Sequence, residues 1–244
     1  MSVRFRLLVA ALMLALWPAA GRAEPVDIEL VLAVDVSRSV DEVEAHLQRQ
    51  GYIQAFRNPR IVRAIANGPL GRIAVAYVEW AAVDFQRLVI DWTVVKDAAS
   101  AGAFADRLAA APRESWSWTS VSGAIDYSAR LFGKAHEGTR MVIDVSGDGR
   151  NNSGRPAAEA RDDALARGIV INGLAIMNDR PNFSRPPDRA LDEWYRENVV
   201  GGFGSFLVVA EDFEAFAEAI LNKLLKEIAS RPDPDTSPAA AAGD

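Results

Sequence analysis

The feature that most constrains the fold is a nearly unbroken apolar segment at residues 28–36. Side chains of a strand point alternately to opposite faces, so a strand that is apolar at nearly every position must be covered on both faces. Similar segments recur at 140–145 and 169–176. Sheets covered on both faces are typical of α/β proteins, in which helices connect parallel strands.

Segments with helical spacing of apolar residues separate these strands. Strands are predicted at 28–36, 72–80, 85–92, 140–145, 169–176 and 206–209. Helices are predicted at 39–56, 104–111, 121–132, 191–199 and 213–228, and between the strands at 140–145 and 169–176. The first is expected to begin at a capping box at Ser39–Glu42 and to end at a break at Asn58–Pro59. The helix at 121–132 is expected to end before a left-handed cap at Gly133.

The order of these elements predicts the architecture. Alternating strands and helices imply right-handed crossovers, and the short connection between 72–80 and 85–92 predicts a hairpin. The predicted fold is therefore α/β, a three-layer doubly wound and mostly parallel sheet with one antiparallel edge strand.

The first 23 residues have the features of a cleavable signal peptide. Arg4 and Arg6 precede an apolar run at 7–17, which is too short for a bilayer core that needs roughly 20 residues. Small residues at Gly21 and Ala23 predict cleavage after Ala23, and an uncleaved anchor is the alternative. We expect a periplasmic or extracellular bacterial protein with no membrane span after cleavage. Its expected parts are a signal peptide at 1–23, one domain at 24–229 and a disordered tail at 230–244.

Charge and composition exclude several functions. The formal charge of −6 becomes −9 once three leader arginines are removed, which disfavours sequence-independent binding of nucleic acid. The chain has no cysteine, so it forms no disulfide and has no thiolate chemistry. Its two histidines, His46 and His136, lack metal-ligand spacing and are expected to be solvated.

Three polar motifs follow predicted strands or begin a predicted helix, where ligands bind in open α/β sheets. Their side chains offer two carboxylates and three hydroxyls, which suit a hard cation such as Mg²⁺. The five candidate metal ligands are Asp35, Ser37, Ser39, Thr119 and Asp148.

Each piece of this set also has a purely structural interpretation. Ser39 and Thr119 are typical helix caps, and Asp148–Gly149 is typical of a turn. The combination, in this order and at these positions, favours a metal site. Asp144, within a predicted strand, is interpreted as structural.

These five residues resemble the metal-ion-dependent adhesion site (MIDAS) of von Willebrand factor A-like and integrin inserted domains. The order of elements agrees from residue 26 to about 229, and residues 194–220 also resemble a bacterial family of secreted, functionally uncharacterised members. The resemblance implies that Asp35, Ser37 and Ser39 bind the metal directly. It implies that Thr119 and Asp148 bind it directly or through water, and that a partner carboxylate takes the open position.

The implied function is metal-dependent protein binding in adhesion or assembly, not enzymatic catalysis, with Mg²⁺ as the cofactor and Mn²⁺ or Ca²⁺ as alternatives. The partner is expected to be an unknown protein that contributes an acidic side chain. The sequence departs from the resemblance in its long segment 178–205 and in Trp116 and Trp118 beside the threonine. Whether these tryptophans bind a partner or pack, and whether Arg38 faces a ligand, stays open.

Two other classes of protein share part of the pattern. Phosphohydrolases of the haloacid-dehalogenase type need a second acid two residues after the first aspartate, and Ser37 occupies that position. Rossmann-type nucleotide-binding proteins need a glycine-rich turn after the first strand, which is absent from residues 36–40. A structural assembly module with a non-functional metal site is the remaining alternative.

Overall fold

A six-stranded sheet organises the part of the chain that the computed structural model describes, residues 23–177, 190–212 and 215–230. The strand order is β3-β2-β1-β4-β5-β6, and only the edge strand β3 runs antiparallel to its neighbour. The predicted doubly wound, mostly parallel sheet with one antiparallel edge strand is thereby confirmed. The strands are β1 (Glu24–Asp35), β2 (Ile73–Trp80), β3 (Gln86–Val95), β4 (His136–Gly147), β5 (Ile169–Ile176) and β6 (Leu207–Ala210).

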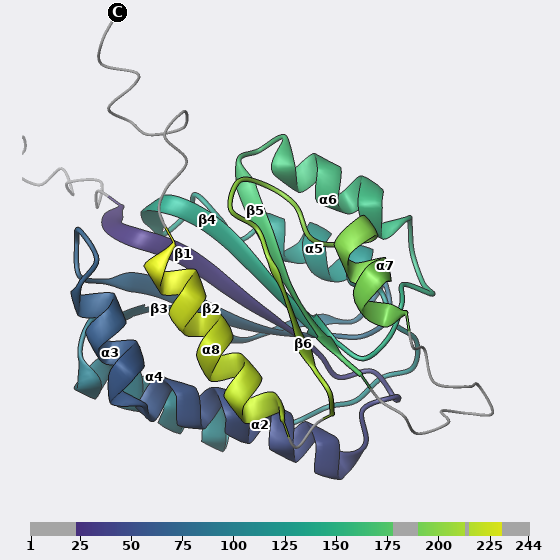
Figure 1. Cartoon of the computed structure of the whole chain (residues 1–244), viewed down its shortest axis with the longest axis horizontal. Helices are drawn as coiled ribbons and strands as arrows, with labels where there is room; N and C mark the ends of the chain where they lie inside the picture. The colour runs from purple at the N-terminus through teal and green to yellow at the C-terminus, as the bar shows by residue number, and fades with distance from the viewer. Residues whose placement is uncertain (1–22, 178–189, 213–214, 231–244) are drawn as a thin grey trace, which may run out of the picture.

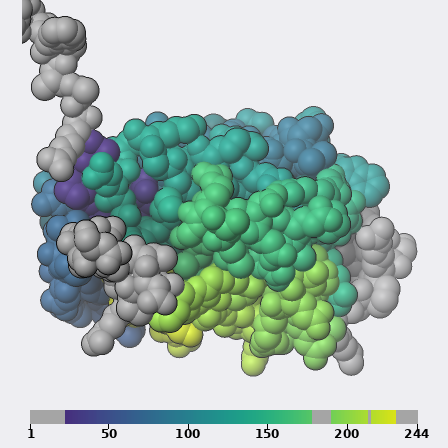
Figure 2. All heavy atoms as spheres, turned by 90° about the horizontal axis from the view of Figure 1, so that it is seen from above, coloured from purple at the N-terminus to yellow at the C-terminus, as the bar shows by residue number. Residues whose placement is uncertain are grey.

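Helices cover both faces of this sheet, as Figure 1 shows. One layer contains α2, α3, α4 and α8, and the other contains α5, α6 and α7. The helices are α2 (Glu42–Arg57), α3 (Pro59–Ala66), α4 (Ala98–Ala110), α5 (Val121–Ala129), α6 (Ala157–Leu165), α7 (Leu191–Asn198) and α8 (Phe216–Ala229). Figure 2 shows the second layer from outside, where the teal and green atoms of this part of the chain form most of the visible surface.

The central strand β1 explains why helices are needed on both faces. Leu30 and Leu32 belong to the apolar core under α2, α3, α4 and α8, whereas Val31 and Ala33 belong to the core under α5, α6 and α7. All four side chains are fully buried. The strand therefore stabilises two cores at once, as its continuous apolar sequence predicts.

The first long helix begins later than the sequence predicted. The N-cap of α2 is Asp41, whose side chain accepts a hydrogen bond from the Glu44 amide, while the Glu44 side chain accepts one from the Asp41 amide. The predicted box at Ser39 and Glu42 was wrong. The Ser39 hydroxyl instead donates to the Asp148 carboxylate, so it serves the candidate site rather than the helix.

Two other helix boundaries also differ from the prediction. Asn58 ends α2 as predicted, but it also caps α3, which the sequence interpretation missed because it took Pro59 as a break. Proline at the first helical position is favourable, since its missing amide has no partner there in any helix. Helix α5 ends at Ala129 instead of continuing to Gly133, although Gly133 does adopt the left-handed conformation, with φ of +71°.

The last helix carries a buried polar layer beside its apolar face. Phe216, Ile220 and Leu224 are fully buried as predicted, but so are Lys223 and Glu227, which the sequence interpretation missed. Lys223 forms an ion pair with Asp144, which lies on the face of β4 that α8 covers. The interpretation of Asp144 as a structural residue agrees with this contact.

Several predictions concern segments outside the described residues. These are the signal peptide up to residue 22, the polar stretch at 178–189, the helix start at 213–214 and the tail from 231. Within the described segments, no helix combines the length and the apolar character that crossing a membrane requires.

Candidate metal site

The candidate site lies where the two central strands end. Asp35 is the last residue of β1, and Asp148 follows directly after the end of the parallel neighbour β4. The chain leaves β1 toward α2 on one face of the sheet and leaves β4 toward α6 on the other. Ligands of open α/β sheets bind at such a point, where the crossovers reverse direction.

The structure brings all five predicted side chains together in one row. The Ser39 hydroxyl donates to Asp148 Oδ1 at 2.6 Å, and the Ser37 and Ser39 hydroxyl oxygens lie 2.8 Å apart. Thr119 Oγ1 lies 3.5 Å from Ser37 Oγ, and the Ser37 amide donates to Asp35 Oδ1 at 2.7 Å. Loops more than a hundred residues apart in the chain therefore bring their oxygens within hydrogen-bonding distance of one another.

Asp35 is the electrostatic centre of the site. Its side chain is fully buried, and its Oδ2 atom has no hydrogen-bond partner among the described residues. Burial, and then the charge of Asp148, raise the pKa of Asp35 well above its ordinary value, against the hydrogen bond from the Ser37 amide. A buried carboxylate with an unpaired oxygen is costly unless a positive charge compensates it.

The backbone around this oxygen is crowded. A Cβ atom on Gly147 would lie 2.9 Å from Asp35 Oδ2 and 2.7 Å from Tyr195 Oη, so only glycine fits without displacing one of them. The Tyr195 hydroxyl is buried and also lacks a partner in the described structure. Burial raises the pKa of Tyr195, and the charges of Asp35 and Asp148 raise it further.

The donor set suits a hard divalent cation. No three His, Asp or Glu side chains gather to hold a metal in the described part of the chain, and the site instead combines two carboxylates with three hydroxyls. All five offer oxygen, the donor that Mg²⁺ and Ca²⁺ prefer. The unpaired Asp35 oxygen is the atom that a cation would neutralise.

Asn152 fixes Thr119 relative to Asp148, a role that the sequence interpretation missed. Its Oδ1 accepts from the Thr119 amide at 2.8 Å, and its own amide donates to the Thr119 carbonyl at 2.8 Å. The neighbouring Asn151 Oδ1 accepts from the Ser122 amide at 3.0 Å. Two consecutive asparagines after Gly149 signal only a turn in the sequence.

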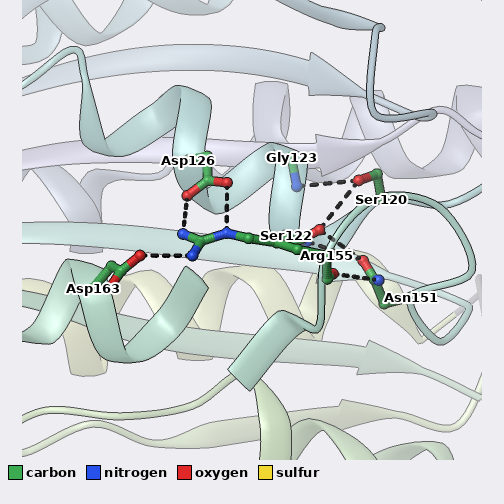
Figure 3. Close-up of polar contacts among 7 residues, drawn as sticks. All are labelled: Ser120, Ser122, Gly123, Asp126, Asn151, Arg155 and Asp163. Carbon is green, nitrogen blue, oxygen red and sulfur yellow. Dashed lines mark hydrogen bonds and ion pairs between the residues drawn. The ribbon is translucent and has the colours of Figure 1, made fainter. Parts of the chain in front are cut away.

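Arg155 attaches the same loop to two helices near the surface, as Figure 3 shows. Its guanidinium donates to both carboxylate oxygens of Asp126 in α5, at 2.7 and 3.1 Å, and contacts Asp163 in α6 at 2.6 Å. Asn151 Nδ2 donates to the Arg155 carbonyl at 3.0 Å. The loop after β4 is thus held to the helices on either side of it.

Two exposed tryptophans border the hydroxyls. The backbone of Trp116 pairs with that of Ser37, and its ring stacks on Phe85 with centroids 5.6 Å apart and planes 6° apart. Trp118 precedes Thr119 and has φ of +69°, the left-handed region that non-glycine residues rarely adopt. The Trp116 side chain is 52 % exposed and packs against Phe85, and the Trp118 side chain is 61 % exposed.

Comparison with solved structures identifies the fold. Proximal thread matrix protein 1 from the mussel byssus, described with a zinc-occupied MIDAS motif, is 13% identical, with a TM-score of 0.58 over 85% of this chain and 46% of that one. The pilus adhesin SpaC from Lactobacillus rhamnosus GG is 15% identical, with a TM-score of 0.59 over 86% of this chain and 31% of that one. A von Willebrand factor type A protein from Catenulispora acidiphila is 14% identical, with a TM-score of 0.56 over 84% of this chain and 42% of that one.

These identities are low enough that the likeness shows the fold alone, which is that of von Willebrand factor A domains. The chain spans less than half the length of each of the three proteins. By sequence, no curated protein matches it. A family model described as "Protein of unknown function (DUF1194)" matches residues 25–232.

Proposed function

The chain belongs to the DUF1194 family of proteins of unknown function and has a von Willebrand factor A-like fold, and we propose that it binds a protein partner through a divalent metal ion. The observation that carries this proposal is the buried Asp35 carboxylate. Its Oδ1 accepts from the Ser37 amide, next to a row of three hydroxyls and a second carboxylate, and its Oδ2 has no hydrogen-bond partner among the described residues. A cation is the group that would compensate this arrangement.

In this proposal the metal ligands are Asp35, Ser37, Ser39, Thr119 and Asp148. Asp35, Ser37 and Ser39 bind directly, and Thr119 and Asp148 bind directly or through water. Oxygen-only donors favour Mg²⁺, with Mn²⁺ or Ca²⁺ as alternatives, over metals that prefer imidazole or thiolate. The bound ion supplies an electrophilic centre for an incoming ligand.

The proposed ligand is a carboxylate from the partner. Only two protein carboxylates face a doubly charged ion, and an external carboxylate gains a charge-assisted contact in a partly dry site. Enzymatic turnover is not part of the proposal. The position two residues after Asp35, where a phosphohydrolase needs an acid, is Ser37, and its hydroxyl contacts Ser39.

We further propose that the chain is exported to the periplasm or cell surface. Support comes from the leader-like sequence of residues 1–23, of which residues 1–22 lie outside the described part of the chain. Mass spectrometry of the exported protein should give Glu24 as its first residue, and a full-length chain retained in the cytoplasm would contradict export.

Affinity capture from periplasmic extract tests the proposed binding. The immobilised protein should retain a partner in Mg²⁺ and release it in EDTA, and Asp35→Asn should retain none because it lacks the central charge. Asp91→Asn, which removes an exposed acid of β3, is the matched control and should behave as wild type. Retention that is the same in Mg²⁺ and EDTA contradicts the proposal.

A further inference from the structure

Exposed apolar side chains gather around the candidate site. We call Val83, Trp116 and Trp118 the tryptophan rim; each is more than half exposed. The Val83 amide donates to Ser153 Oγ in the loop after β4, so Val83 adjoins the loop that carries Asp148. Trp116 pairs with Ser37 through the backbone, and Trp118 precedes Thr119, so the rim borders the site hydroxyls directly.

The segment that leads to Trp116 is anchored by its neighbours, although the rim side chains face solvent. Arg87 donates to the Pro112 carbonyl at 2.8 Å and pairs with Glu114, and Arg113 donates to the Val40 carbonyl at 3.2 Å. These contacts anchor the segment that leads to Trp116. Rigid exposed aromatic rings bind partners at a low cost in conformational entropy, which is why they are common in binding surfaces.

The backbone conformation of Trp118 is also typical of a binding surface. Its left-handed conformation is unfavourable for a tryptophan, and the Asn152 contacts to both backbone groups of Thr119 hold the neighbouring residue in place. Strained backbone that the surroundings enforce is typical of ligand-binding positions. The Trp118 ring is exposed beside the site and belongs to neither apolar core.

Charge around the site indicates what kind of segment fits the rim. Arg38 lies between Ser37 and Ser39, Arg150 lies two residues after Asp148, and both are exposed. In the proposed metal-bound state the ion offsets the two aspartate charges and offers an open position to a carboxylate, although the whole chain carries a formal charge of −6. An acidic segment is the complementary ligand.

We propose that the tryptophan rim makes the site selective for an acidic polypeptide segment in which an aromatic side chain adjoins the metal-bound carboxylate. The aromatic side chain packs against Trp116 and Trp118 while the carboxylate reaches the ion. This inference rests on the proposed metal-dependent binding and adds the chemistry of the partner to it.

Three capped synthetic peptides test the inference, with the sequences Gly-Phe-Asp-Phe-Gly, Gly-Gly-Asp-Gly-Gly and Gly-Phe-Asn-Phe-Gly. Their dissociation constants are measured by NMR titration of the full chain in Mg²⁺ and in EDTA. In Mg²⁺ the aromatic aspartate peptide should bind roughly 3- to 10-fold more tightly than the glycine aspartate peptide, the range expected for aromatic contacts.

Trp118→Gly should remove most of this preference and leave Mg²⁺ affinity unchanged, because it deletes the ring and relieves the left-handed strain. Phe203→Ala is the matched control and should keep the preference, since this equally exposed ring precedes β6 at the opposite edge of the sheet.

The outcomes separate the two proposals. If the two aspartate peptides bind with equal, Mg²⁺-dependent affinities, the rim inference is overturned and the metal-dependent binding stays intact. An unchanged preference of Trp118→Gly for the aromatic aspartate peptide has the same meaning. Binding of the asparagine peptide as tightly as the aspartate peptide, in EDTA as in Mg²⁺, contradicts the metal-dependent mechanism itself. Absence of binding by every peptide contradicts both.

Discussion

At the scale of single residues, the space around Asp35 is as important as its charge. Gly147 and Gly149 flank Asp148, but they face different surroundings. A Cβ atom at Gly147 would lie under 3 Å from both Asp35 Oδ2 and Tyr195 Oη, whereas one at Gly149 would lie 3.7 Å from the Thr119 side chain. The first position tolerates no side chain, and the second has ordinary room.

This difference gives a prediction with an internal control. Gly147→Ala should cost about 1–3 kcal/mol of folding free energy, the usual result of overpacking, and should weaken Mg²⁺ binding by displacing Asp35. Gly149→Ala should change both quantities little. Urea denaturation and metal titration of the two variants measure them, and equal effects at the two positions would refute this account of the site.

Part of this residue-scale picture could be predicted from the sequence. Asp35, Ser37 and Ser39 are close together in the chain, and the topology alone places Asp148 opposite them. The roles of Asn152 and Tyr195 could not be predicted, because they depend on contacts between loops 33 residues apart and between α7 and the end of β4. The exposure of Trp116 and Trp118 likewise depends on tertiary contacts.

At the scale of elements, α8 is attached to the sheet through both apolar and polar contacts. Asn172 in β5 donates to both carboxylate oxygens of Glu227 at 2.8 Å, and Arg140 donates to the Glu227 carbonyl at 2.6 Å. Lys223 pairs with Asp144 in the same layer. Burial lowers the pKa of Lys223 to about 7, against the charge of Glu227, and burial also raises the pKa of Glu227.

The energetics of this layer can be tested with a double-mutant cycle. Lys223→Met should cost about 3–5 kcal/mol, because it leaves the Asp144 carboxylate buried without its partner. Adding Asp144→Leu should recover at least about 1 kcal/mol of that loss, since the unpaired acid is then gone. Chemical denaturation of the wild type, both single variants and the double variant provides the values. Strictly additive losses would contradict a direct Lys223–Asp144 interaction.

Helical spacing predicted α8 but not the buried polar residues on it. Phe216, Ile220 and Leu224 form an apolar stripe that is visible in the sequence, whereas Lys223 and Glu227 read as solvated positions. Their burial follows from polar residues on β4 and β5, which no periodicity of the helix reveals. Helix α3 was missed for a different reason, because a proline that begins a helix looks the same in sequence as one that ends a helix.

At the scale of the whole molecule, topology creates the candidate site. Because β1 and β4 are parallel neighbours, the loops that follow them emerge at one edge of the sheet. Because their following helices lie on opposite faces, these loops diverge at the end of the sheet. The alternation of strands and helices predicted this topology, so the fold and the location of the site were predictable together.

The most direct test of the metal site is calorimetric titration of Mg²⁺ into the wild type and Asp35→Asn, with thermal melts in Mg²⁺ and in EDTA. Asparagine retains a carbonyl oxygen for the Ser37 amide, but it removes the charge and replaces the second oxygen with an NH2 group that cannot bind a metal ion. The wild type should bind about one ion and gain stability as Mg²⁺ increases, by about 2.7 kcal/mol at a hundredfold excess over its dissociation constant.

Asp35→Asn should bind no metal and should melt in EDTA at or above the wild-type temperature, because burial and Asp148 disfavour the charged carboxylate. Failure of the wild type to bind Mg²⁺ or Mn²⁺ at millimolar concentrations, or wild-type affinity in Asp35→Asn, would contradict the account.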